Sequence, residues 1–237
     1  MSHDPDQMPD TLPKDNRRAL RLVARGCHKA ALGTILAGAE TPYVSLVTVA
    51  FDLDMAPLLL LSGLADHTRN LMADDRCSLL LDGTDGHPNP QTGPRVTLCG
   101  RAEKLPPEAD GALRARFLAR HPGAALYAGF GDFALWRMTP ARAHFVGGFG
   151  RAVWFDAPFG LTSDTVEELR AAEPALLDRL NRDLAPRLDG WRIAALDPDG
   201  ADLSVGQDFR RLNIRAPIEQ VGDLPAALAD SLDHASG

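Results

Sequence analysis

Seven short strand-like segments between residues 32 and 147 constrain the fold more than any other feature of the sequence. They are rich in valine, leucine and threonine, and turns, loops or single helices separate them. The segments are Leu32–Leu36, Tyr43–Phe51, Pro57–Ser62, Cys77–Leu81, Val96–Leu105, Phe133–Met138 and Ala143–Gly147. Strands joined mostly by short turns favour an antiparallel barrel over the regular strand–helix alternation of a parallel sheet.

Helical patterns before, between and after these strands complete the predicted fold. Residues 15–31 form an amphipathic pattern, residues 65–74 a second helix, and residues 106–120 a third. The leucines of residues 165–188 also recur at helical spacing, and three short strands and a helix over 223–232 follow. We therefore expect an α+β fold, in which an antiparallel barrel is followed by a small αβββα domain.

The expected domain boundaries follow from composition. The first residues are acidic and contain prolines, so residues 1–14 are predicted to form a disordered tail. The barrel is assigned to residues 15–157 and the αβββα domain to residues 165–237, with a linker between them.

Residues 142–155, RAHFVGGFGRAVWF, combine a strand pattern with a glycine-rich corner. Its three glycines allow positive φ angles or a close approach of the backbone to a ligand. Arg151 and Trp154 follow directly and offer a partner for an anion and a plane for stacking. A bulge that closes a barrel strand explains the same glycines, so both interpretations stay open.

A second candidate site begins where an apolar strand leads into a helix, in the sequence SGLADHTRN at 62–70. The start of a helix presents free N–H groups and a partial positive charge, which suit a phosphate, and Asp66 is a suitable N-cap. Thr68 and Arg69 add a hydroxyl and a guanidinium, both good donors to phosphate oxygens. An ordinary capped helix with solvated polar residues is the alternative.

The segments from Gly33 to Leu105 and from 142 to 155 together resemble the pyridoxamine 5′-phosphate oxidase-like FMN-binding split barrel. The closer resemblance is to the branch that contains haem-utilisation and haem-oxygenase-like proteins. Residues 160–237, with the turn DPDGADL, are similar to the small α/β domain that follows the barrel in that branch. The resemblance implies a split barrel that binds FMN, forms a homodimer with the flavin between two barrels, and has haem as an alternative ligand.

The resemblance also implies which residues hold the cofactor. Ser45, Val47 and Thr48 belong to the strand that lies along the flavin ring, and Arg95 either reaches a partner's flavin or is a surface charge at the barrel rim. The usual arginine–lysine pair for the phosphate is reduced here to arginine followed by asparagine. The full set of predicted cofactor-binding residues is Ser45, Val47, Thr48, Ser62, Leu64, His67, Thr68, Arg69, Asn70, Arg95, Arg151 and Trp154.

Haem-utilisation relatives often carry a histidine-methionine-asparagine-alanine-aspartate-histidine motif in the second domain. The corresponding residues 179–184, RLNRDL, keep the asparagine and the aspartate and lack both histidines. His234 near the C-terminus is the first candidate for an iron ligand, with a frayed tail as its alternative explanation. His67 and His144 have the pKa range of acid–base groups, although a structural hydrogen bond is the more common role of such residues.

Composition and charge narrow the function classes. The formal net charge is −7, which argues against a general nucleic-acid or membrane-surface role, because both need a positive surface. Cys27, Cys77 and Cys99 lack metal-type spacing, and Cys77 and Cys99 lie in strand-like runs, where buried neutral thiols are expected. No segment resembles an export signal or is apolar for long enough to span a bilayer, which predicts a cytoplasmic protein.

Three functions remain open from the sequence. The first is an FMN-binding, oxidoreductase-like protein of unknown substrate, in which the flavin carries the redox chemistry. The second is a haem-binding or haem-degrading protein, and the third is a cofactor-free dimeric binding protein. No side chain stands out as an essential acid or base. Pyridoxamine phosphate oxidation itself is not expected, because the extra domain replaces the C-terminal segment of those enzymes.

Overall fold

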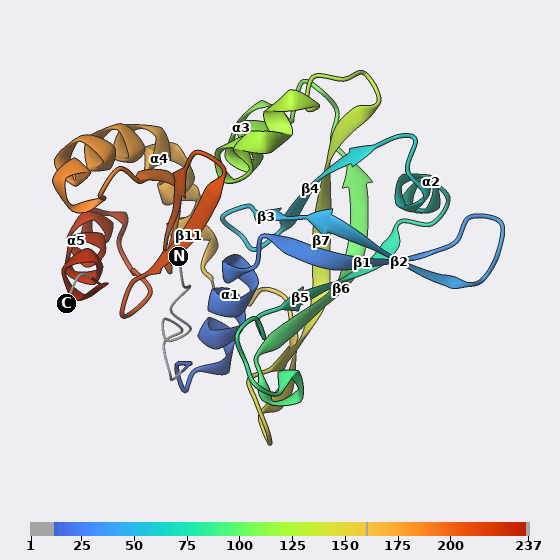
Figure 1. Cartoon of the computed structure of the whole chain (residues 1–237), viewed down its shortest axis with the longest axis horizontal. Helices are drawn as coiled ribbons and strands as arrows, with labels where there is room; N and C mark the ends of the chain where they lie inside the picture. Colours follow the sequence, from blue (N-terminus) through green and yellow to red (C-terminus); the bar gives the residue numbers. More distant parts are fainter. Residues whose placement is uncertain (1–11, 160, 236–237) are drawn as a thin grey trace.

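The computed structural model of the protein describes residues 12–159 and 161–235. Most of the predicted disordered tail, residues 1–11, and the last two residues of the chain lie outside this range. The described residues form a large antiparallel sheet, a small three-stranded sheet and the helices around them (Figure 1). This arrangement confirms the predicted α+β fold class.

The larger sheet contains eight strands within the described residues, in the order β2-β1-β5-β6-β7-β4-β3, with β8 also paired to β7. Every pairing in it is antiparallel. The strands are β1 (Lys29–Ile35), β2 (Pro42–Thr48), β3 (Ala50–Phe51), β4 (Pro57–Ser62), β5 (Arg76–Asp82), β6 (Arg95–Lys104), β7 (Phe133–Val146) and β8 (Ala152–Asp156).

Alternation of side chains gives this sheet a buried inner face and an accessible outer face. On the inner face, Leu32, Leu79 and Leu98 lie side by side in register, and all three are fully buried. One step along the strands, Leu80 belongs to the outer face and is 40% exposed. The inner face therefore supplies the core of the barrel. The outer face stays accessible at β1, β2 and β5, whereas at β4 and β7 it packs against helix α3 (Gly111–Arg120), with Leu58, Leu60 and Leu135 buried beside Phe117.

The structure corrects the predicted strands at β7 and β8. One continuous strand replaces the two predicted segments, because the pairing with β6 shifts by one residue at Pro140 and this bulge tolerates its missing N–H. The glycine corner then reverses the chain: the Gly147 amide donates to the Arg151 carbonyl over 2.8 Å. Gly148 and Gly150 have φ angles of 120° and 78°. These glycines therefore form the turn between β7 and a strand, β8, that the sequence pattern did not predict.

Three α-helices accompany the larger sheet: α1 (Asn16–Gly26), α2 (Asp66–Ala73) and α3 (Gly111–Arg120). Helix α1 starts where the Asp15 carboxylate accepts a hydrogen bond from the Arg17 amide over 2.9 Å. Helix α3 starts later than predicted, because the chain after Pro106 first forms a turn in which the Ala109 amide donates to the Pro106 carbonyl. Short 3₁₀ helices occupy Pro90–Thr92, Pro122–Leu126, Ala185–Arg187 and Val221–Asp223.

The rest of the chain has the predicted αβββα order. Its elements are α4 (Ser163–Asp183), β9 (Arg192–Asp197), β10 (Gly200–Val205), β11 (Asp208–Asn213) and α5 (Leu224–Ala235). The strands pair in the order β11-β10-β9. Leucines of both helices, including Leu169, Leu180 and Leu228, pack with Leu203 of β10 in a separate hydrophobic core.

Buried ion pairs join this second unit to the barrel through α1, which Figure 1 shows between the two sheets. The Asp199 carboxylate accepts two hydrogen bonds from Arg21, over 2.6 and 2.8 Å. Asp197 accepts from Arg211 of β11 and lies 3.4 Å from the guanidinium of Arg25. The side chains of these pairs are at most 6% exposed. The two units are therefore connected by charges that must stay paired.

Candidate functional site

Helix α2 packs against β1 and β2 and carries the densest group of predicted site residues. Asn70 fixes the helix in place. Its amide nitrogen donates to Thr34 Oγ1 over 2.9 Å, and its Oδ1 accepts from the Ala37 amide over 2.8 Å. Because Asn70 is only 1% exposed and both of its polar atoms are used, this side chain holds the helix and does not face its N-terminus.

The N-terminus of α2 has no side-chain cap. Asp66 is the first helical residue and not the predicted N-cap, which is Ala65. The Ala65 carbonyl accepts from the amides of Thr68 and Arg69, both over 3.2 Å. An alanine side chain cannot satisfy the free amides of a helix start, so this end keeps a partial positive charge for an anion. Asp66 and Arg69, which bind each other, place opposite charges beside it.

His67 connects α2 to the neighbouring strand β2. Its Nδ1 lies 3.1 Å from the hydroxyl oxygen of Ser45. Burial lowers the pKa of His67 below its usual value of 6.5, against the opposing effect of the nearby Asp66 carboxylate. The imidazole is therefore neutral at neutral pH, and the hydrogen bond orients the ring so that Nε2 is the nitrogen left for a metal ion.

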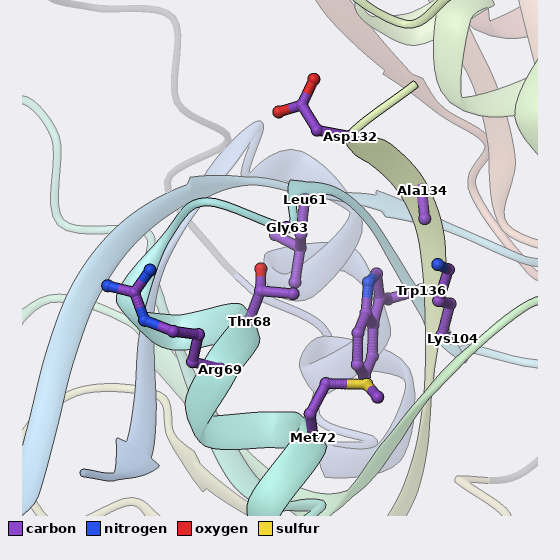
Figure 2. A pocket seen from close by; sticks show the side chains of 9 residues that line it. All are labelled: Leu61, Gly63, Thr68, Arg69, Met72, Lys104, Asp132, Ala134 and Trp136. Carbon is purple, nitrogen blue, oxygen red and sulfur yellow. The ribbon is translucent and has the colours of Figure 1, made fainter. Parts of the chain in front are cut away.

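A pocket of about 360 Å³ lies between α2 and the strands β4, β6 and β7 (Figure 2). In the sheet register, Leu61 is opposite Ala134 and Lys104 is opposite Trp136, which places each pair on one face of the sheet. We call this cavity the barrel-end pocket. It is lined by Leu61, Gly63, Thr68, Arg69, Met72, Lys104, Asp132, Ala134 and Trp136.

Two buried polar atoms of the barrel-end pocket have no hydrogen-bond partner among the described residues: Thr68 Oγ1 and Trp136 Nε1. Thr68 is 6% exposed and Trp136 is 2% exposed. Figure 2 shows the hydroxyl of Thr68 and the indole nitrogen of Trp136 at the ends of their side chains nearer to Asp132. A buried polar group left unpaired costs roughly 1–3 kcal/mol, so these atoms favour a bound ligand or ordered water.

Ser62 and Arg69 organise the edge of this pocket. The Ser62 hydroxyl donates to the Asp132 carboxylate and accepts from the Leu64 amide over 3.1 Å. Arg69 donates to the Leu64 carbonyl over 2.8 Å and to a carboxylate on its own helix. Figure 2 shows its guanidinium turned away from the indole ring of Trp136. Arg69 is thus already partnered, and it lies at the helix start more than in the pocket interior.

Several predicted cofactor residues lie away from α2 in the same chain. Thr48, Arg95 and Trp154 belong to the outer face of the sheet, where Trp154 stacks on His144 with ring centroids 4.7 Å apart. Val47 points into the barrel core and is 6% exposed. One chain therefore gathers Ser45 of β2 with the predicted residues that follow β4 and belong to α2, and separates them from Thr48 and from the predicted residues of β6 and β8.

Arg151 holds the N-terminal segment and contacts no residue of α2. Its Nε donates to Asn16 Oδ1 over 2.6 Å, and its guanidinium lies 5.3 Å from the ring centroid of Phe145. The turn that carries Arg151 follows Val146, which pairs with Arg95 at the start of β6. The barrel-end pocket lies at the other end of the same strand, so the two regions are a strand length apart.

His234 and the cysteines also lie outside the α2 region. His234 is on α5, which Figure 1 shows on the opposite side of the molecule from α2, and its Nδ1 lies 2.7 Å from the Asp230 carbonyl oxygen. Burial raises the pKa of Cys27 and of Cys77 to about 12. The prediction of a buried thiol is confirmed for Cys77, whereas Cys99 is only half-buried.

His121 is a structural histidine: burial lowers its pKa to about 4, and its Nε2 lies 2.9 Å from the Val49 carbonyl oxygen. Among residues 12–159 and 161–235, no three histidine, cysteine, aspartate or glutamate side chains cluster as metal ligands would. Haem is compatible with this finding, because the porphyrin supplies four ligands and the protein adds one or two. None of the helices in the described part of the chain has the length and apolar character of a membrane span.

Sequence reasoning did not identify Trp136, Lys104 and Asp132 as pocket residues. The alternation of β7 does place Trp136 on the same face as Met138, which is the pattern of a core residue. An indole N–H in a buried strand position was the available signal, because that donor needs a partner.

Comparison with known proteins agrees with this structure. A model of the CREG β-barrel family matches residues 13–158. The chain is 36% identical over 132 residues to the non-canonical heme oxygenase HOZ, chloroplastic, of Arabidopsis thaliana. That alignment covers 56% of this chain and 38% of the plant protein, so the chain spans well under half of that relative.

Two solved structures cover nearly the whole chain. The protein Atu2129 of Agrobacterium tumefaciens, of unknown function, is 29% identical with a TM-score of 0.77 and covers 96% of this chain and 100% of its own. A heme binding protein from Mycobacterium smegmatis is 26% identical with a TM-score of 0.58, over 95% of this chain and 99% of its own. These matches confirm the resemblance to the split barrels and their haem-utilisation branch. Since the family model spans more than half of its length, the chain belongs to the CREG β-barrel family.

Proposed function

We propose that this protein binds haem where α2 meets β2, with His67 as the iron ligand. The hydrogen bond between His67 and Ser45 carries the proposal, because it orients a neutral imidazole through Nδ1 and leaves Nε2 for iron. Two relatives support the ligand class, the plant heme oxygenase and the mycobacterial heme binding protein. Haem degradation, the activity that the name of the plant protein states, extends the proposal beyond binding.

The residues around α2 fit haem in two further respects. Leu64 is 76% exposed, so it offers apolar contact that the chain itself leaves uncovered. Arg69 carries a positive charge at the start of the helix and suits an anionic propionate. Bound haem would supply a redox-active iron. The chain would bind that iron, orient the ring of His67 and balance the negative charge.

FMN is the second candidate ligand. The uncapped N-terminus of α2 and the neighbouring Arg69 are groups that bind phosphate. Asp66 acts against it, because a carboxylate in the first turn repels a phosphate dianion more strongly than a propionate, which carries a single charge. The structure thus favours the imidazole over the phosphate site as the main determinant of binding.

We further propose that the outer face of the sheet joins two copies of the chain. The sheet register aligns one row across six strands: Leu46, Ala31, Leu80, Thr97, His144 and Trp154. Leu46 is 74% exposed, Trp154 is 49% exposed, and Val44 on the same face is 65% exposed. Exposed apolar side chains gathered on one face in this way are typical of an interface. A partner chain would cover it and would meet three predicted cofactor residues, Thr48, Arg95 and Trp154.

Sedimentation equilibrium tests this dimer. We expect a mass about twice that of the 25.5 kDa chain. Leu46→Glu places a charge in the proposed interface and should give the monomer mass. Leu126→Glu is the matched control, because Leu126 is 81% exposed and lies in a 3₁₀ helix away from this face. A monomeric wild type, or a dimer that tolerates Leu46→Glu, contradicts the proposal.

The ligand proposal is tested by titrating cofactor-free protein with haem and, separately, with FMN. We expect a saturable Soret band with haem and a weaker change of flavin fluorescence with FMN. Saturable binding of FMN without that of haem would replace the proposal by the second candidate. Failure of both ligands to bind would leave the cofactor-free function as the remaining one.

A further inference from the structure

The barrel-end pocket contains two polar atoms that the fold leaves unsatisfied. Among the described residues, six buried side-chain nitrogen or oxygen atoms lack a hydrogen-bond partner. Three of them are Nε atoms of arginines whose terminal nitrogens do form hydrogen bonds. Thr68 Oγ1 and Trp136 Nε1 are different, because each is the one polar side-chain atom of its residue and both residues line the same pocket. Their coincidence indicates a ligand that accepts hydrogen bonds there.

The barrel-end pocket is too large to be filled by a single water molecule. Its volume of about 360 Å³ lies within the range of roughly 300–1,000 Å³ that small-molecule sites occupy. One water takes up only about 30 Å³ of liquid volume. The pocket is thus large enough for a compact organic molecule.

The lining defines the chemistry of that molecule. Leu61, Ala134 and the exposed Met72 provide apolar contact for its body. The indole N–H of Trp136 can only donate, and the Thr68 hydroxyl is able to donate, so the ligand must present acceptor oxygens.

The charges select one class of acceptor. Lys104 stands opposite Trp136 in the sheet, and Figure 2 shows its side chain beside the indole ring, so a cation is available for an anion. Asp132 also lines the pocket, and its carboxylate already accepts from Ser62. One carboxylate at the edge disfavours a dianion more than a monoanion. The balance therefore favours a carboxylate over a phosphate.

We propose that the barrel-end pocket binds a small monocarboxylate with an apolar body, with Thr68 and Trp136 donating to its carboxylate and Lys104 balancing the charge. This pocket is separate from the His67 site, because His67 faces Ser45 of β2 while Thr68 faces β4 and β7. The proposal does not depend on haem or FMN binding.

Benzoate is a suitable probe, followed through the indole N–H signals of ¹⁵N-labelled protein. The chain has three tryptophans, and Trp136→Phe assigns the signal of the pocket. We expect benzoate to shift the Trp136 signal saturably and to leave the other two in place. Benzyl alcohol, which lacks the charge, and inorganic phosphate should each bind at least ten times more weakly.

Thr68→Val removes the hydroxyl at nearly constant volume. We expect it to weaken benzoate binding about 10- to 150-fold, the effect of one lost hydrogen bond to a charged group. Thr139→Val, at an exposed position of the same strand as Trp136, is the matched control and should bind like wild type. The persisting Trp136 signal reports that each variant is folded.

Three results would overturn the proposal. They are the absence of a saturable Trp136 shift with benzoate, equal affinities of wild type and Thr68→Val, and displacement of benzoate by haem or FMN. The last result would mean that the pocket is part of the cofactor site.

Discussion

Replacing Asp197 by asparagine should destabilise the protein strongly, because it removes a charge that two buried arginines share. The Asp197 side chain is 2% exposed, accepts from Arg211 over 2.8 Å and lies 3.4 Å from Arg25. Removing one partner of a buried ion pair costs about 3–5 kcal/mol. Asp202 remains 3.0 Å from Arg211 and compensates part of the loss. We therefore expect the lower end, about 3 kcal/mol.

Thermal unfolding followed by circular dichroism measures this loss. For a chain of this length, about 3 kcal/mol corresponds to a decrease in Tm of roughly 6–12 °C. Asp233→Asn is the control, because Asp233 pairs with Arg187 over 3.4 Å and both side chains are about half exposed. An exposed pair contributes less than about 1 kcal/mol. Equal decreases in Tm for the two variants would refute the reasoning.

The ionisation of Asp197 determines the pH range in which the Asp197→Asn substitution destabilises the protein. Burial opposes the ionisation of Asp197, but Arg211 and Arg25 outweigh burial and lower its pKa below the usual 3.8. A group with a lowered pKa in the folded state stabilises the protein above its unfolded pKa, and this contribution is lost as the pH falls through the folded pKa. The Tm difference between wild type and Asp197→Asn should therefore be constant from neutral pH to about pH 5 and shrink only below pH 4.

Three further predictions concern other parts of the chain. Haem affinity through His67 should weaken as the pH falls through its pKa, with a midpoint below 6.5 in a Soret titration, and a midpoint above 6.5 would contradict this ligand. Gly100→Ala should cost about 1–3 kcal/mol in urea unfolding, because its Cβ would overlap the carbonyl oxygen of the opposite strand. Gly111→Ala, with open space at Cβ, should cost nothing. Cys27 and Cys77 should resist a thiol reagent at pH 8 in native protein and react after unfolding, and rapid reaction of either in the native state would refute their burial.

The sequence predicted most elements because their side chains alternate or recur at helical spacing. The strands around Leu32, Leu79 and Leu98 are clear examples. Each of these inner-face leucines lies either between polar or small neighbours or within a longer apolar run, and both patterns are typical of a strand. Strand β8 was not predicted, because a glycine-rich corner indicates a turn but does not show that the residues after it form a strand and pair with β7. The prediction that the strand is interrupted between Met138 and Ala143 was wrong. A bulge at Pro140 keeps β7 continuous, and such a bulge can be recognised only from the pairing with β6.

The candidate site was predictable only in part. The residues of α2 could be found, because a helix start with a hydroxyl and an arginine is a local pattern. The role of Asn70 was not visible, since its partners Thr34 and Ala37 are more than 30 residues away in sequence. The contact of Ser45 with His67 and the meeting of Thr68 with Trp136 likewise depend on tertiary structure.

The most direct test of the haem proposal is a titration of His67→Ala with haem, followed by the Soret band. His67 is expected to bind the iron, so the variant should lose saturable binding or show a displaced band. Ser45→Ala should weaken binding roughly 10-fold or more, because it removes the group that orients the ligand. His234→Ala should titrate like wild type. Wild-type titration curves for His67→Ala, with loss of the band in His234→Ala, would contradict the account and assign the iron ligand to α5.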